Sequence, residues 1–377
     1  SERESLYIVS KFAEDFFVEQ LHQSDEGKAI GLSYFRERGF SDEIIQHFKL
    51  GYSPDKWNTF TTAALDKGYQ KEYLLKAGLT KERDGNLYDG YRGRVIFPIH
   101  NLSGRPIGFG GRTLKTDKKV PKYVNSPECD IYNKRKVLYG LYFAKKAIVK
   151  ADQCLLVEGY TDVISLFQCG LENVVASSGT SLTVDQIRLI SRYTKNITIL
   201  FDGDPAGIKA SFRGIDLILE EGLNVKVVLF PEGEDPDSFA RKSDQEEMQE
   251  FLRQNAKDFL VFKTDLLLQD TEGDPIKKAQ LIREIVESIA RIPDFIARSV
   301  YVKECSNLLD VPEKALVSEL NKIRRKNFNK ANKEALPEPP PEPEAPAEDP
   351  QKWKHGIAVV QQQMDDSHFL MFGRIRM

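Results

Sequence analysis

Between residues 153 and 243 the sequence alternates short apolar runs with amphipathic stretches, and few folds fit this alternation. The apolar runs are QCLLVEG, ENVVASSG, NITILFDGD and NVKVVLFPEGED. Between them lie the helix-like segments TDVISLFQCG, TVDQIRLISRY and PAGIKASFRGIDLILEEG. Strands that are apolar almost throughout belong to parallel sheets covered on both faces, with helices as the connections. We therefore predict a compact α/β unit over residues 151–243.

The preceding region, residues 1–148, combines helical and strand patterns. FAEDFFVEQL has apolar residues at helical spacing. SYFRERGFSDEIIQHF predicts two short helices, with Gly39 ending the first and Ser41 capping the second. RVIFPI and PIGFGGR, on either side of a Ser103-Gly104 turn, predict a β-hairpin. This region is expected to be a basic α+β subdomain.

The remaining sequence predicts helices followed by a linker. Residues 244–330 show long helical periods without a strand signal, which is typical of a small helical bundle. Residues 331–377 contain EALPEPPPEPEAPAEDP, an acidic proline-rich linker, and then a short, disordered tail. The expected fold class is therefore mixed α/β and α+β, with a C-terminal helical bundle.

Positive charge is concentrated in one part of the chain. The whole sequence has a formal net charge of −3, but residues 87–136 contain 11 Lys and Arg against 4 Asp and Glu. A locally cationic surface attracts a polyanion even when the average charge is negative. The basic region therefore favours a polyanionic partner such as nucleic acid.

Composition excludes several other classes of protein. The 41% hydrophobic and 29% charged fractions are those of a soluble globular protein. No apolar run approaches the roughly 18–20 residues that cross a bilayer, and SERESLYIVS lacks the layout of a secretory signal. A cytoplasmic protein without a membrane partner is expected. The four cysteines have no paired spacing, so neither a disulfide framework nor a zinc site is expected. They are Cys129, Cys154, Cys169 and Cys305.

Acidic residues follow three of the four predicted strands. Glu158 follows the first, Asp202 and Asp204 follow the third, and Asp235 and Asp237 follow the fourth. Ligands of open parallel sheets bind beyond the carboxyl ends of the strands, so these carboxylates are expected to meet at one edge. Neighbouring carboxylates repel unless a cation lies between them, and Mg²⁺ prefers carboxylates together with substrate phosphates. The sequence thus indicates a Mg²⁺ site, in which Mn²⁺ can substitute.

Several of these acids also have a purely structural interpretation. Asp204 precedes a proline and could be the N-cap of the next helix. Asp237 could cap the helix that follows it, and Asp162 lies in a first helical turn, where a carboxylate favours the helix dipole. Glu158 and Asp202 are harder to explain in this way, since each follows an apolar strand and precedes a glycine.

Motifs along residues 33–330 resemble those of one protein family. VEGYTDVISL, LFDGDPAGIKA and EGEDPDSF resemble the signature of the Toprim module, an α/β unit shared by topoisomerases and primases. Upstream lie ERGF, GYSP, GRVIFPI, GRPIGFGGR, PKYVNSPE and IYNKRK, in the order expected of the same family. The sequence is thus similar to the catalytic core of DnaG-type bacterial primases.

The resemblance implies a Mg²⁺-dependent RNA polymerase that makes short primers on single-stranded DNA by two-metal nucleotidyl transfer. The family's principal metal-binding and catalytic acids match Glu158, Asp202 and Asp204. Further acidic positions of the same pocket match Asp162, Asp235 and Asp237. Metal binding and proton transfer both stay open for Glu158. The implied partners are single-stranded DNA, ribonucleoside triphosphates and the RNA primer, with the replicative helicase and single-strand-binding protein for the full-length parent. A monomer is expected.

The basic region supplies candidates for nucleotide and template contacts. PKYVNSPE combines a cation, an aromatic ring and an amide, which suit phosphates and stacked bases; they are Lys122, Tyr123 and Asn125. Arg112 ends the glycine-rich GFGGR, where the backbone can approach a polyanion closely. Lys209 either reaches a phosphate or is a solvated helix lysine. The track is extended by Arg38, Arg92, Arg94, Lys134 and Arg135, although for any one of them a solvated surface charge is the commoner explanation.

Two features usual in the family have no match in this sequence. Nothing corresponds to its zinc ribbon, and the chain ends shortly after the linker, before the usual helicase-binding helical domain. The polymerase core of a longer protein is therefore expected, with a scaffolding role for the helical bundle.

Two rival functions use the same module. A Toprim topoisomerase or nuclease shares the acids, but a topoisomerase also needs a large cleavage domain, and a non-catalytic scaffold like RecR needs no full set of acids.

Overall fold

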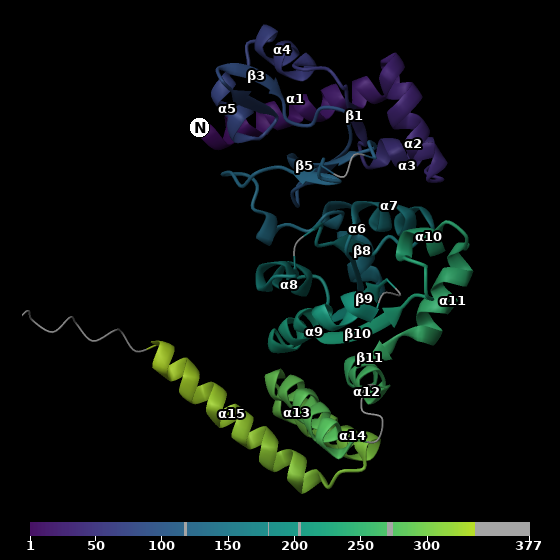
Figure 1. Cartoon of the computed structure of the whole chain (residues 1–377), viewed down its shortest axis with the longest axis vertical. Coiled ribbons are helices and arrows are strands. Elements are labelled where there is room, and N and C mark those ends of the chain that lie inside the picture. The colour runs from purple at the N-terminus through teal and green to yellow at the C-terminus, as the bar shows by residue number, and fades with distance from the viewer. Residues whose placement is uncertain (117–118, 180, 203–204, 270–273, 336–377) are drawn as a thin grey trace, which may run out of the picture. The chain divides into compact units, whose positions relative to one another are not determined.

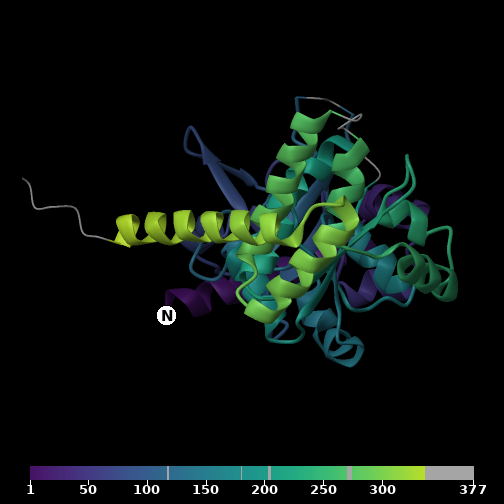
Figure 2. The same ribbon diagram turned by 90° about the horizontal axis from the view of Figure 1, so that it is seen from below.

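The computed structural model describes residues 1–116, 119–179, 181–202, 205–269 and 274–335, without the side chains of 205–211, 269 and 330–335 (Figure 1). Ser1–Ile323 form one compact unit, and Arg324–Met377 form a second. Along the chain, an N-terminal region, a parallel-sheet region and a helical region follow one another. Figure 2 shows the same ribbon from below. The predicted mixed fold class is confirmed. No helix in the described ranges is long and apolar enough to cross a bilayer.

The N-terminal region is built on an antiparallel sheet that one long helix covers. α1 (Glu2–Gln23) buries Leu6, Val9, Ala13 and Phe17, which share one helix face. The sheet has the strand order β1-β4-β5-β6. Its strands are β1 (Gly51–Ser53), β4 (Arg94–His100), β5 (Pro106–Thr113) and β6 (Tyr123–Asn125). The other elements are η1 (Gly27–Leu32), α2 (Ser33–Glu37), α3 (Asp42–His47), α4 (Thr59–Asp66), α5 (Lys71–Lys76), β2 (Thr80–Arg83), β3 (Asn86–Asp89) and η2 (Lys134–Lys136).

The two short helices and the β-hairpin predicted for this region are present. Gly39 follows α2 with a φ of 79°, and the Ser41 hydroxyl accepts a hydrogen bond from the backbone N–H of Ile44 at 3.3 Å, which caps α3. β4 and β5 are joined by a turn in which the Asn101 side chain accepts from the backbone N–H of Ser103 at 3.0 Å. The sequence pattern was sufficient here because turn and cap residues act locally.

The second region is the predicted parallel sheet. Its strand order is β11-β10-β9-β7-β8, and β10, β9, β7 and β8 pair in parallel. The strands are β7 (Cys154–Val157), β8 (Val174–Ala176), β9 (Asn196–Phe201), β10 (Asn224–Leu229) and β11 (Lys257–Asp258). The helices are α6 (Leu141–Ala151), α7 (Tyr160–Gln168), α8 (Val184–Ser191) and α9 (Pro205–Glu220). β11 corrects the prediction, because it is an antiparallel edge strand within the stretch expected to be wholly helical. β11 has only two residues, too few to show the alternation of apolar and polar residues that identifies a strand in a sequence.

The two faces of this sheet belong to two different cores. On β7, Leu155 and Val157 point into the core shared with α7 and the N-terminal region. Cys154 and Leu156 point into the core shared with α6, α8, α9 and the helical region. Alternation along a strand sends successive side chains to opposite faces. The sheet therefore joins the N-terminal region on one side to the helical region on the other.

The helical region continues the chain after β10. Its helices are α10 (Pro236–Ala240), α11 (Gln245–Asn255), α12 (Phe259–Gln269), α13 (Pro275–Arg291), α14 (Phe295–Leu309) and α15 (Glu313–Ala335). A buried lysine connects three elements, because Lys263 of α12 donates to Asp216 of α9 at 2.9 Å and to Ser288 of α13 at 2.6 Å. α15 continues five residues beyond the expected end of the bundle at 330. The remaining linker and tail, residues 336–377, lie outside the described ranges.

Candidate active site

Two of the predicted acids lie at the carboxyl ends of neighbouring strands. β7 ends directly before Glu158 and β9 directly before Asp202, and the two strands pair in parallel. Residues that follow both strands therefore emerge at one edge of the sheet. Both side chains are exposed. Asp204 and the side chain of Lys209 lie outside the described part of the chain, so their roles stay predictions.

Asp162 is the most strongly perturbed acid at this edge. It lies in the first turn of α7, where its Oδ2 accepts a hydrogen bond from the Gly159 backbone N–H at 3.0 Å. Burial, followed by the charges of Asp202, Asp235 and Asp237, raises the pKa of Asp162 to about 7. Asp162 thus lies in the first turn of α7, as expected, and its carboxylate also lies within the field of three other acids.

Asp235, and not Asp237, caps the helix that follows β10. The Asp235 Oδ1 accepts from the Ser238 backbone N–H at 2.6 Å, and the Ser238 hydroxyl accepts from the Asp235 N–H at 3.0 Å. This corrects the sequence interpretation, which offered Asp237 as a cap. Pro236 takes the first helical position because it has no N–H to leave unsatisfied, and this places the cap at Asp235, two residues before Asp237.

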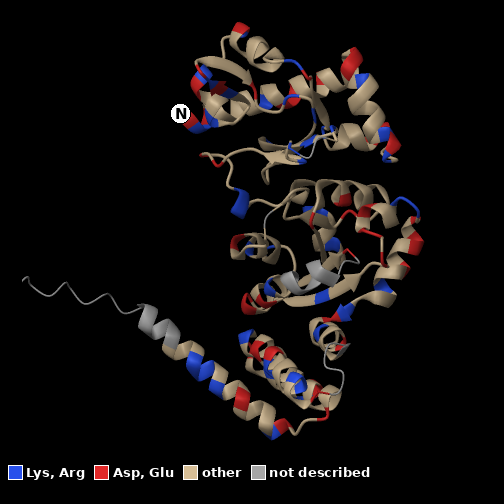
Figure 3. Ribbon diagram, in the orientation of Figure 1, with Lys and Arg blue, Asp and Glu red and all other residues tan. Residues whose placement is uncertain are grey.

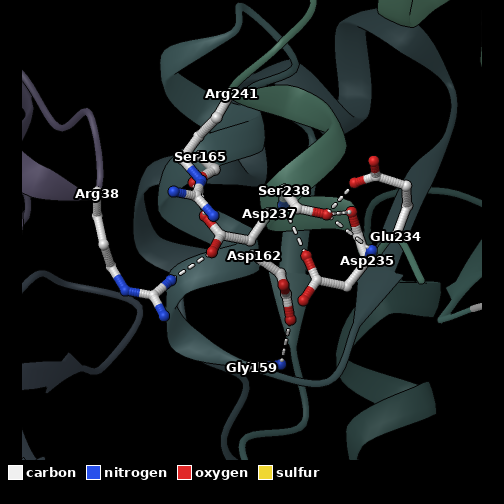
Figure 4. A network of polar contacts seen from close by, with 9 residues as sticks. All are labelled: Arg38, Gly159, Asp162, Ser165, Glu234, Asp235, Asp237, Ser238 and Arg241. Atoms are coloured by element: carbon white, nitrogen blue, oxygen red, sulfur yellow. Dashed lines mark hydrogen bonds and ion pairs between the residues drawn. The ribbon is translucent and has the colours of Figure 1, made fainter.

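Asp237 is buried and surrounded by donors. Its side chain is 5% exposed. The Ser165 hydroxyl donates to its Oδ1, the Arg38 guanidinium donates to its Oδ2, and the Arg241 Nε lies 3.5 Å from Oδ1 (Figure 4). Arg38 comes from the N-terminal region, 199 residues away in the sequence. The ion pair therefore joins the basic region to the acidic edge.

The donor chemistry of this edge fits a hard divalent cation. Glu158 and Asp202 are exposed acids at this edge, and burial together with the charges of Asp202, Asp235 and Asp237 raises the pKa of Asp162. A bound cation would relieve that repulsion. Among the described residues, which do not include Asp204, no group of three or more Asp, Glu, His or Cys side chains is arranged to hold a metal ion. The complete ligand set stays a prediction.

An aromatic and cationic surface of the N-terminal region lies against these acids. The Arg112 guanidinium lies 4.9 Å from the ring centre of Tyr34 and 5.9 Å from that of Tyr123. Burial raises the pKa of Tyr123, with opposing effects from Arg112 and Arg38 and reinforcing ones from Asp162 and Asp237. Tyr123 therefore lies near cations of the N-terminal region and also near acids of the sheet edge. Sequence reasoning missed Tyr34, although it stands four residues before Arg38 in SYFRERGF.

Arg112 also lines a cavity and retains unused donors. Its Nε and Nη1 atoms are buried and have no hydrogen-bond partner among the described residues. The cavity beside it has a volume of about 830 Å³, and Lys115 and Lys122 also line it. Buried guanidinium donors without a partner are costly, so they favour an anionic ligand. Arg112 and Lys122, both predicted to contact nucleotide or template, line the same cavity.

Other predicted contact residues have structural partners. The Asn125 Oδ1 accepts from the Tyr160 hydroxyl at 2.6 Å, and its Nδ2 donates to the Ser178 carbonyl at 3.4 Å. Asn125 thus joins β6 to the parallel-sheet region. Arg94 is buried, and its guanidinium donates to three backbone carbonyls, so it holds the segment before β6 and is not part of an open track. Those carbonyls belong to Gly111, Pro121 and Lys122.

The remaining predicted cations lie at the surface of the basic region. Arg92 pairs with Asp55 at 3.4 Å and lies over the Trp57 ring at 5.3 Å. Lys134 begins η2, a short turn made wholly of Lys and Arg (Figure 3). Arg135 of the same turn is exposed. These three stay candidates for a nucleic-acid partner.

Comparison with known proteins places the whole arrangement in one family. Residues 16–145 match the description "DNA primase catalytic core, N-terminal domain", and residues 155–240 match "Toprim-like". A DNA primase domain from Pseudomonas aeruginosa, known from its crystal structure, is 32% identical, with a TM-score of 0.75 over 85% of this chain and 99% of that chain. The chain belongs to the DnaG-type DNA primases.

Curated and solved primases support this membership. The DNA primase of Halalkalibacterium halodurans is 38% identical over 330 residues, 86% of this chain and 54% of that protein. The DNA primase of Clostridium acetobutylicum is 37% identical, over 88% of this chain and 54% of that protein. The chain thus spans about half the length of these relatives. A solved DnaG primase catalytic domain bound to ssDNA is 34% identical, with a TM-score of 0.72 over 81% of this chain and 99% of that chain.

The primase comparison also corrects one expectation. Residues 261–314 match the description "DnaB-helicase binding domain of primase". We expected this helical region to act as a scaffold, and we expected no counterpart of the family's helicase-binding domain. Helical periods alone do not separate a scaffold from a docking domain, because both are amphipathic helices packed on a core. Primases with a Toprim module generally depend on a divalent metal, which agrees with the acidic edge.

Proposed function

We propose that this chain is the RNA-polymerising core of a DnaG-type DNA primase, which joins ribonucleotides on a single-stranded DNA template. The meeting of two surfaces supports this most directly. Carboxylates at the ends of separate strands share one field around Asp162, and Tyr123 of the basic region, with Arg112 5.9 Å from its ring centre, is within the electrostatic reach of Asp162 and Asp237. A phosphodiester-cleaving Toprim enzyme would share the acids. The match of residues 16–145 to the N-terminal domain of the primase catalytic core favours a primase instead.

The reaction that fits this arrangement is an in-line nucleotidyl transfer. A 3′-hydroxyl attacks the α-phosphate of a ribonucleoside triphosphate, the bond to the β-phosphate breaks, and pyrophosphate leaves. Mg²⁺, or Mn²⁺ in its place, supplies positive charge for the attacking and leaving oxygens when it is bound by Glu158, Asp202 and Asp204. Asp162 and Asp235 would add negative charge beside Asp202.

The chain's own cations and rings would position the polyanions. Arg112 offers two unpartnered N–H groups beside the cavity, where a phosphate can accept them. The Tyr123 ring is 36% exposed and can stack a base, while Lys122 on the preceding position is exposed to solvent. Lys134 and Arg92 would extend the path of the backbone phosphates. Asn125 would act indirectly, by holding β6 against the parallel-sheet region.

The wider partners follow from the same assignment. The template, ribonucleoside triphosphates and RNA primer bind at the acidic edge and basic surface. The match at residues 261–314 supports contact with the replicative helicase, and a replication enzyme of this kind works in the bacterial cytoplasm on DNA coated by single-strand-binding protein. A monomer is sufficient, because both surfaces come from one chain.

One assay tests the proposal against its rivals. The protein is incubated with single-stranded DNA, labelled ribonucleotides and Mg²⁺ or Mn²⁺. We expect short RNA products. Cleaved DNA would indicate a nuclease, and neither product would indicate a non-catalytic scaffold; both results contradict the proposal.

Substitution of the acids tests the metal assignment. Replacing Asp202 and Asp204 together by Asn should abolish incorporation and leave the circular dichroism spectrum unchanged. Asp185→Asn is a matched control, because Asp185 is an exposed acid of the same region in the first turn of α8. Sustained synthesis by the double variant would exclude these two acids as metal ligands.

A further inference from the structure

One turn of the N-terminal region docks on the parallel-sheet region through specific polar contacts. The turn between α2 and α3 contains Arg38, Gly39 and Ser41. The Gln168 side chain, at the end of α7, donates from Nε2 to the Gly39 carbonyl at 2.7 Å and accepts at Oε1 from the Ser41 backbone N–H at 2.8 Å. Arg38 reaches past this pair to Asp237. The turn is thus fixed at both ends by side chains from another region.

The environment of Asp237 leaves it little capacity to bind a metal ion. One carboxylate oxygen receives the Ser165 hydroxyl and lies 3.5 Å from the Arg241 Nε, and the other receives the Arg38 guanidinium. The side chain is 5% exposed, and that of Arg38 is 22% exposed. A buried carboxylate with donors on both oxygens is already neutralised. Figure 4 shows Arg38 approaching Asp237 from a separate segment.

The same ion pair is connected to the cationic surface through the ring of Tyr34. Arg38 lies 5.4 Å from the ring centre of Tyr34, and Arg112 lies 4.9 Å from the same ring. Arg112 in turn stands opposite Tyr123 in the register of β5 and β6. A shift of the turn would therefore disturb the packing of Tyr34 against Arg112, beside the acids of the sheet edge.

We propose that Asp237 is a positioning residue and not a metal ligand: with Arg38 and Gln168 it forms a lock that holds the cationic surface at a fixed distance from the metal-binding acids. This proposal rests on the proposed polymerase function. It reassigns Arg38 from the template track and Asp237 from the metal site. A small misplacement of a substrate-binding group lowers the reaction rate by a large factor. Loss of the lock should therefore lower kcat more than it lowers the affinity for the metal ion.

Two variants separate a lock from a ligand. Asp237→Asn keeps the size and one acceptor oxygen but loses the charge that pairs with Arg38. Gln168→Leu removes both hydrogen bonds to the turn and lies outside the acidic edge. If Asp237 belongs to the lock, both variants lower kcat, by about tenfold or more for Asp237→Asn, and both keep the Mn²⁺ affinity within about twofold. If Asp237 is a ligand, Asp237→Asn alone loses Mn²⁺ affinity and Gln168→Leu behaves like wild type.

The matched control is the neighbouring exposed ion pair. Arg36 and Asp42 flank the same turn, at 3.0 Å and with side chains 56% and 59% exposed, but they do not cross to the other region. Arg36→Met should therefore leave kcat and Mn²⁺ affinity unchanged. The double neutral variant Arg38→Met with Asp237→Asn avoids a buried unpaired charge, and its loss of kcat should be no larger than that of Asp237→Asn alone. A double variant that loses much more would contradict a shared role.

Two readouts do not depend on RNA synthesis. Mn²⁺ binding is measured by electron paramagnetic resonance on the full chain. Amide hydrogen exchange of the peptide that contains Ser41 reports the contact with Gln168, and it should become faster in Gln168→Leu and Asp237→Asn but not in Arg36→Met. Unchanged exchange in both variants would overturn the lock. Absence of RNA synthesis by the wild type, with intact exchange differences, would instead reject the proposed function.

Discussion

Gly110 of β5 packs directly against the ring of Tyr160 in α7, and this predicts a large effect of one added methyl group. A Cβ atom added to Gly110 of β5 would lie 2.5 Å from Cζ of Tyr160 and 2.6 Å from its hydroxyl oxygen. Ordinary van der Waals contact begins near 3.4 Å. The Tyr160 ring would therefore have to retreat by about 1 Å, into a region packed to interior density.

The ring has no free direction in which to retreat. Tyr160 is 4% exposed. It stacks on Phe97 with ring centres 5.1 Å apart, contacts Tyr139 at 4.7 Å, and donates to Asn125 at 2.6 Å. Overpacking of this kind costs about 1–3 kcal/mol, and loss of the hydrogen bond adds about 1 kcal/mol. We expect Gly110→Ala to lower the free energy of unfolding by about 2–4 kcal/mol.

Urea denaturation followed by circular dichroism measures this loss. Tyr160→Phe, which removes only the hydroxyl, should lose about 1 kcal/mol. Gly214→Ala is the control with the opposite sign, because Gly214 lies inside α9 and its nearest atom would be 3.8 Å from an added Cβ. Alanine in a helix interior should be neutral or stabilise by about 0.5–1 kcal/mol. A Gly110→Ala protein as stable as Gly214→Ala would refute the close-approach reasoning.

Three further predictions concern single side chains. Lys122→Ala should weaken single-stranded DNA binding and reduce the slope of log affinity against log salt by about 1; an unchanged slope across a salt series would remove Lys122 from the phosphate track. Lys263→Met should destabilise the fold by about 1–3 kcal/mol in urea, because Asp216 loses its buried lysine partner but keeps Arg291 at 3.4 Å and the Ser288 hydroxyl at 2.7 Å; adding Asp216→Asn should recover part of that loss. Asp89 is 3% exposed, and burial raises its pKa in the folded protein. The stability that Asp89 contributes is therefore complete below its pKa in the unfolded chain, about 4, and it is lost as the pH rises through its pKa in the folded protein. The difference in unfolding free energy between wild type and Asp89→Asn should therefore shrink above pH 4, and a difference that grows would contradict the sign.

Local patterns in the sequence were sufficient for the elements and for the edge that carries the acids. Alternating apolar runs and helical periods predicted β7 to β10 and the helices between them, because each pattern is read within one element. Glu158 and Asp202 could be placed at one edge from sequence position alone, since parallel strands deliver their carboxyl ends to the same side. The family motifs, such as PKYVNSPE and EGEDPD, then predicted the primase assignment.

Only the tertiary structure decided how individual side chains are used. Arg38 and Asp237 are both plausible functional residues in the sequence, but they neutralise each other across 199 residues. Arg94 looked like part of a basic track and instead holds three carbonyls, and Asn125 looked like a nucleotide contact and instead bridges two regions. The physical reason is that a charge or amide has the same local signature whether it faces solvent, substrate or a distant partner. Periodicity encodes which face of an element is buried, whereas pairing depends on packing between elements far apart in the chain.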